Sequence, residues 1–80
     1  MTAGTVVIRQ AIGSDEAALG RLAALDSAHV PSGDLLVAER DGALVAAHAP
    51  RSGATIADPF RPTAEVVQLL QLRSTLLRAA

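Results

Sequence analysis

The apolar residues of this chain fall into five patterned segments, separated by glycine, proline and short polar side chains. Residues 5–11, TVVIRQA, are rich in β-branched side chains and predict a strand. Residues 15–27 place alanine and leucine at spacings of three and four, which predicts a helix with one apolar stripe. Ser14 is expected to cap that helix with its hydroxyl, and Asp15 and Glu16 suit the first turn, where the helix dipole favours anions.

The segment from residue 35 to residue 49 predicts a β-hairpin. Asp41-Gly42 separates two apolar runs, residues 35–40 and 43–49, and this dipeptide readily adopts the positive φ angles of a two-residue hairpin turn. Neither run alternates cleanly between apolar and polar residues, so both faces of each strand are expected to be covered. Two helices, one on each face, would supply that cover, as would one helix together with a partner.

The last third of the chain predicts a turn over residues 51–54, a short strand over residues 55–57 and a helix over residues 62–78. Asp58 precedes a proline and is expected to be extended, while Pro62 suits the first position of a helix. Apolar residues span about 220° of the helical wheel, more than the roughly 100° that a surface helix needs. They are Val66, Val67, Leu69, Leu70, Leu72, Leu76 and Leu77, with Arg73 inside the arc. This helix is therefore expected to be well buried or to meet another subunit.

These elements predict one small α/β (α+β) domain over residues 1–80, in the order β-α-β-β-β-α. The expected architecture is a mainly antiparallel four-stranded sheet with two helices. A chain of 80 residues buries only about 60–65% of its unfolded surface, and its apolar residues are mostly alanine, valine and leucine. The absence of cysteine excludes disulfides and thiolate metal sites, which leaves oligomerisation as the expected source of further stability.

Charge and composition exclude several classes of partner. The net charge is −1, the charged residues are interspersed, and Phe60 is the only aromatic residue, so no nucleic-acid partner is expected. All seven basic residues are arginine, a composition typical of high-GC bacterial genomes. No apolar run approaches the roughly 20 residues of a membrane span, and the first residues lack the pattern of a signal peptide. A cytoplasmic protein that is not integral to a membrane is expected.

Two segments resemble the GNAT superfamily of N-acetyltransferases. Ile8-Arg9-Gln10-Ala11, followed by a capped helix with a Leu-x-x-Leu pattern, is similar to the first strand and helix of that family. The segment LLVAERDGALVAAHA, residues 35–49, is similar to its second strand, turn and third strand. The resemblance covers about residues 6–57 and implies a GNAT-like half-fold, truncated after its N-terminal half.

The resemblance ends at the loop that follows the expected fourth strand. In GNAT enzymes this loop reads Gln/Arg-x-x-Gly-x-Gly/Ala, and its backbone N–H groups cradle the pyrophosphate of acetyl-CoA. The corresponding segment here is DPFRPTAE, which has no glycine and contains two prolines that lack an N–H donor. The resemblance therefore transfers no catalytic or cofactor-binding residue to this chain, and no cofactor is expected.

Charged candidates for chemistry are few. Arg61 precedes the last helix and is a weak candidate for holding an anion. The competing interpretation pairs Arg61 with Asp58 or Glu65. Glu39 and Asp41 flank the hairpin turn and would suit acid–base work as a pair of carboxylates. Turn chemistry accounts for Asp41, however, and Glu39 is expected to pair across the strands.

The two histidines also have simpler explanations than catalysis. His48 would serve as a general base near neutral pH, but a hydrogen-bonded histidine at the end of a strand is the more common arrangement. His29, in a loop beside Pro31, is expected on the surface. The pair lies far apart without a matching carboxylate motif, so no metal site is expected.

The favoured hypothesis is a non-catalytic GNAT-like protein that works through protein–protein contacts, as a homodimer or an accessory subunit. The alternative is an acetyltransferase-like or acyl-CoA-binding protein whose site is assembled across a dimer. The candidate interface combines an open strand edge with the apolar arc of the last helix. Its residues are Thr55, Ile56, Val66, Val67, Leu69, Leu70, Leu72, Leu76 and Leu77.

Overall fold

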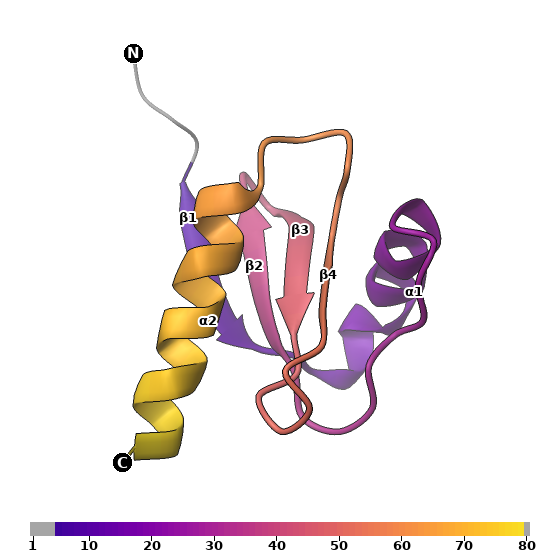
Figure 1. Ribbon diagram of the computed structural model, residues 1–80. Coiled ribbons are helices and arrows are strands. Elements are labelled where there is room, and N and C mark those ends of the chain that lie inside the picture. The colour runs from indigo at the N-terminus through magenta and orange to yellow at the C-terminus, as the bar shows by residue number, and fades with distance from the viewer. Residues whose placement is uncertain (1–4, 80) are drawn as a thin grey trace.

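The computed structural model describes residues 5–79, which form a sheet between two helices (Figure 1). The four strands are antiparallel and lie in sequence order: β1 (Val6–Gln10), β2 (Leu36–Arg40), β3 (Ala43–His48) and β4 (Thr55–Ala57). A short 3-10 turn, η1 (Gly13–Asp15), leads into α1 (Glu16–Leu25), and α2 (Ala64–Ala79) follows β4. The predicted α+β fold, with a four-stranded antiparallel sheet and two helices, is confirmed.

The helices cover opposite faces of the sheet. Leu19 and Leu22 of α1 pack on one face, in a cluster with Leu35, Val37, Ala47 and Ile56. Val66 and Leu70 of α2 pack on the other face, in a cluster with Leu36, Ala38, Val45 and Ala46. The hairpin was expected to be covered either by two helices, one on each face, or by one helix and a partner. The structure has one helix on each face. The apolar residues on both faces of β2 and β3 are buried by this arrangement.

The hairpin turn has the predicted geometry. Asp41 and Gly42 have φ angles of 54° and 86°, so both turn residues adopt the positive values that the Asp-Gly pair favours. The strands are each one residue shorter than predicted. The register shifts between Ala38 and Glu39, where Val45 is an extra residue in β3. Because of this bulge, the consecutive residues Val45 and Ala46 are both buried on the face that α2 covers.

α1 is shorter than the predicted helix over residues 15–27. The expected capping role of Ser14 is not observed, because Ser14 lies inside η1 and is exposed. The carboxylate of Asp15 instead accepts the N–H of Ile12 at 2.8 Å. At the other end, Ser27 adopts a φ of 51°, and the N–H of Ala28 donates to the carbonyl of Ala23 at 2.9 Å. This left-handed residue ends the helix two residues before the predicted position.

α2 begins two residues later than predicted. The first helical hydrogen bond runs from the N–H of Val67 to the carbonyl of Thr63, at 2.8 Å, so Thr63 is the capping residue. Pro62 lies before the helix, and its carbonyl accepts a hydrogen bond from the guanidinium of Arg40 at 3.2 Å. That contact fixes the start of α2 beside the end of β2.

Candidate interaction surface

One side of α2 is buried against the sheet, and a second apolar side is exposed. Val66 and Leu70 are 1% and 0% exposed, and Ser74 continues this buried side at the same spacing of four. Leu69, Leu72 and Leu76 are 46%, 56% and 59% exposed. Because they are spaced by three and four residues, they form one line along the helix. We call these three residues the leucine stripe.

The leucine stripe lies on the side of α2 nearer to β1. α2 starts beside Arg40 at the end of β2, and Leu77 lines a shallow depression with Leu36 at the start of β2, so α2 runs antiparallel to β2 (Figure 1). Each residue of a right-handed helix is rotated by about 100° from the one before it. With this helix direction, the residue that precedes a buried residue lies on the side of β1, and the residue that follows it lies on the side of β3. Leu69 precedes Leu70, and half-buried Val67 follows Val66. Because α2 contacts β2 and β3, one strand lies beyond it on each side: β4 on the side of Val67, and β1 on the side of the stripe.

β1 is an open edge of the sheet within residues 5–79. The carbonyl of Thr5 accepts the N–H of Asp41, and the N–H of Ala11 donates to the carbonyl of Leu35, so the odd-numbered residues face β2. The backbone N–H and C=O groups of Val6, Ile8 and Gln10 consequently point away from the sheet. Of these, the carbonyl of Gln10 accepts a hydrogen bond from Nη1 of Arg9 at 3.2 Å. This edge has regular register and contains no proline, although natural proteins often use irregularity or proline to block an edge.

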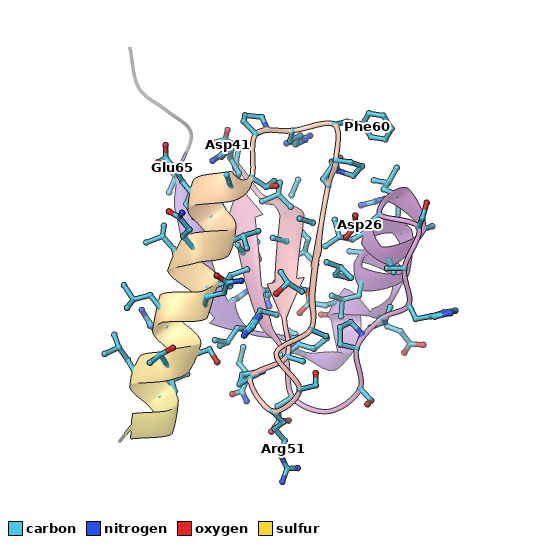
Figure 2. All side chains as sticks on the ribbon, in the orientation of Figure 1. Asp26, Asp41, Arg51, Phe60 and Glu65 are labelled. Atoms are coloured by element: carbon cyan, nitrogen blue, oxygen red, sulfur yellow. The ribbon has the colours of Figure 1, made fainter. Side chains whose placement is uncertain are left out.

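The opposite edge, β4, is covered by the chain itself. It is three residues long, and the outward N–H of Ala57 donates to the carboxylate of Asp26 at 3.1 Å. Figure 2 shows Asp26 between α1 and β4. The sequence candidate Ile56 is buried under α1, and Thr55 is half-buried. The strand edge expected to attract a partner is therefore short and partly blocked.

The structure divides the rest of the predicted interface into buried and exposed residues. Val66 and Leu70 belong to the core and offer no surface to a partner. Val67 is half-buried, while Leu77 is about half exposed beside the depression at the start of β2. Only the leucine stripe combines exposure with a regular line of apolar side chains.

His48 is a buried histidine with a hydrogen-bonded ring, as the simpler interpretation predicted. It is 5% exposed, and its Nδ1 lies 2.7 Å from the hydroxyl oxygen of Thr55. Burial lowers the pKa of His48 below its usual value, because the charged ring loses hydration. His29 is exposed in its loop, which confirms the prediction of a surface position.

Arg9 connects two carboxylates that sequence analysis did not bring together. Its Nε donates to Glu39 at 2.7 Å, and its Nη1 and Nη2 donate to the two oxygens of Asp15 at 2.8 and 2.9 Å. The hydrogen bonds from Arg9, followed by that from the N–H of Ile12, lower the pKa of Asp15 to about 2. The predicted pairing of Glu39 across the strands is confirmed. No spacing pattern identifies Asp15 as the second partner of Arg9, because it is the turn after β1 that places Asp15 beside the Arg9 side chain.

The loop before α2 directs its polar groups toward Asp58. The N–H of Phe60 donates to the carboxylate of Asp58 at 2.8 Å, and the guanidinium of Arg61 lies 3.6 Å from the same side chain. The interpretation that pairs Arg61 with Asp58 is thus confirmed. Arg61 lies in a small depression that Arg21 of α1 also lines. Phe60, at the tip of the loop, points outward above α1 and away from α2 (Figure 2).

Comparisons of the chain with protein families, characterised proteins and solved structures give no match. The resemblance to the GNAT superfamily therefore rests on the quoted sequence segments alone. Among residues 5–79, no three histidine, cysteine, aspartate or glutamate side chains are grouped as metal ligands would be. No helix in this part of the chain is long and apolar enough to cross a membrane.

Proposed function

We propose that this protein acts through protein–protein contacts, as a homodimer or an accessory subunit, and that the leucine stripe of α2 is its contact surface. The observation that supports this most directly is the alignment of three half-exposed leucines on a helix whose other side is fully packed. Single exposed apolar residues are normal on proteins, whereas contiguous apolar patches often mark interaction sites. Spacings of three and four suit contact with a second helix or an apolar groove.

The polar groups support a role without catalysis. Three candidates for acid–base chemistry have hydrogen-bond partners within the fold: His48 has Thr55, Glu39 has Arg9, and Asp41 has the N–H of Thr5. His48 is 5% exposed, so a substrate would have to displace packed side chains to reach it. The charge of Arg61 is likewise shared with Asp58.

Site-specific photocrosslinking tests the proposed surface. A photoreactive residue at position 72, on the stripe, is compared with one at position 71, which is exposed on another side of α2. We expect a discrete crosslinked product from position 72 and none from position 71, in cells that produce the protein. The same products from both positions, or no product from either, would contradict the proposed function.

A further inference from the structure

We propose that the partner is a second copy of this chain, and that the two α2 helices pack antiparallel along their leucine stripes. This inference rests on the proposed function of the leucine stripe, and it adds the identity of the partner and the direction in which the helices run. The helices alone make the contact, so no pairing between strands is needed.

The position of the leucine stripe on α2 leaves room for a second helix. Successive residues of a helix are rotated by about 100°, so the three leucines of the stripe lie roughly 100° to 160° around the axis from buried Leu70. The stripe therefore points away from the sheet as well as to the side of β1. Packed helices lie about 8–10 Å apart. A second helix on the stripe is thus farther from the sheet than α2 itself, and the sheet does not obstruct it.

The spacing along the stripe makes this side of α2 complementary to itself. Four residues follow one another at intervals of four, three and four, the pattern by which two helices interlock their side chains: Glu65, Leu69, Leu72 and Leu76. A two-fold axis perpendicular to the helices, between Leu69 and Leu72, sets each Leu69 against the partner's Leu72. Each Leu76 then lies level with the partner's Glu65 at the end of the contact, where the carboxylate remains in water. One symmetry operation therefore covers all three leucines of both copies.

The charges beside the stripe favour the antiparallel direction. Glu65 lies in the first turn of α2 and Arg73 follows Leu72, and both charged side chains are exposed. Among the side chains that the structure describes, neither of them forms an ion pair within the chain. In the register above, Glu65 and the partner's Arg73 are offset by three residues, or about 4.5 Å, along the helices, so opposite charges approach. A parallel pair would instead place the two Glu65 carboxylates together.

The size of the contact sets the expected strength. A standard interface takes roughly 800 Å² from each partner, a large share of a chain whose accessible surface is 5174 Å². One side of one helix, with three half-exposed leucines, belongs to the smaller class of weak and transient interfaces. We therefore expect a dimer in equilibrium with monomer, with a dissociation constant of about 10–100 µM.

Sedimentation equilibrium with charge-swapped variants tests the inference. Arg73→Glu and Glu65→Arg each place like charges together, and the dimer contains each pair twice, so each single variant should associate at least tenfold more weakly than the unaltered protein. The double variant restores opposite charges and should recover association to within about threefold. Gln71→Glu changes the charge on another exposed side of α2 and is the control, which should associate as the unaltered protein does. Unchanged circular dichroism would show that the variants fold.

Crosslinking measures the direction of the helices without disrupting the dimer. The chain has no cysteine, so a single introduced thiol reports one position. In the antiparallel pair the two copies of Leu69 are offset by about 4.5 Å along the helices, and the two copies of Leu76 by about 16 Å. We expect a short bismaleimide reagent to link two copies of the Leu69→Cys variant and not two copies of Leu76→Cys. Equal yields from the two variants, as a parallel pair would give, would contradict the proposed geometry.

The outcomes separate this inference from the proposed function. A monomer at about 500 µM, without a Leu69→Cys crosslink, overturns the second copy as partner. A discrete product with a different protein from position 72 would then still support the stripe as a contact surface. A dimer that neither single charge variant weakens overturns the inference as well, because its interface must lie elsewhere. So does a double variant that stays as weak as the single variants, because the two charges then do not meet.

Discussion

At the scale of single residues, the interior of this protein accommodates two titratable side chains in different ways. Asp15 remains charged because Arg9 and a backbone N–H donate hydrogen bonds to its carboxylate. His48 is hydrogen-bonded to the hydroxyl of Thr55 and is buried, so its neutral form is favoured. Each side chain makes the stability of the fold depend on pH, in its own pH range.

His48 should make the protein less stable as the pH falls below about 6.5, which is the usual histidine pKa. Burial lowers the pKa of His48 in the folded state, so the unfolded chain binds the proton more readily and gains population at acidic pH. Urea unfolding between pH 7.5 and pH 5 measures this effect as a falling midpoint. The dependence of this midpoint on pH should weaken in the His48→Gln variant. It should remain in the His29→Ala variant, because His29 is exposed. Equal slopes in both variants would show that another group is responsible.

Arg61 provides the residue-scale test of the alternative function, binding of an acyl-CoA. Because the N–H of Phe60 and the side chain of Arg61 are both directed to Asp58, we expect millimolar acetyl-CoA to leave the melting temperature within about 1 °C. Differential scanning fluorimetry with and without the ligand measures this. A clear rise that disappears in Arg61→Ala would instead favour a cofactor-binding protein.

At the scale of elements, local sequence signals predicted the strands and turns better than the helix ends. Asp41-Gly42 specified the hairpin turn, because few residue pairs accept positive φ at both positions. The helix ends depend on contacts with distant residues or on a strained residue. The carbonyl of Pro62, just before α2 begins, accepts a hydrogen bond from Arg40 of β2, and Ser27 ends α1 in a conformation that favours glycine.

Replacing Ser27 by glycine should stabilise the protein. Ser27 adopts a left-handed φ of 51°, which costs a non-glycine residue about 1 kcal/mol, so Ser27→Gly should recover roughly 0.5–1 kcal/mol. Denaturant unfolding measures the change in the free energy of unfolding. Ala24→Gly, at an exposed position within α1, is the matched control and should lower stability by about 1 kcal/mol. A loss in both variants would show that the Ser27 hydroxyl matters more than the backbone.

The candidate surface illustrates what a helical wheel alone leaves undetermined. The sequence indicated a wide apolar arc on the last helix, and Val66, Leu70 and Leu72 all belong to it. Which part of the arc is buried depends on how the helix lies on the sheet, and that placement rests on packing between residues that are distant in sequence, such as Leu70 and Val45. The preference for β4 as the open edge overlooked Asp26, because its contact with Ala57 joins residues that are distant in sequence.

At the scale of the whole molecule, a homodimer formed through the leucine stripe should make thermal stability depend on protein concentration. Association stabilises the folded state by mass action, by roughly 1 kcal/mol for a tenfold rise in concentration above the dissociation constant. For a domain of this size, that corresponds to a rise of about 4–8 °C in melting temperature. Scanning calorimetry over a range of concentrations measures the shift, and Leu72→Glu should abolish it. A melting temperature independent of concentration in the unaltered protein would contradict the dimer.

The apolar residues on both faces of β2 and β3 have a consequence for misfolding. Each helix covers one face, so the detachment of either helix leaves a broad apolar surface on paired strands. Such a surface, next to the free β1 edge, is the kind of template on which partly unfolded chains aggregate. The burial of Val66 and Leu70 against the sheet would therefore protect the protein from aggregation as well as hold α2 in place.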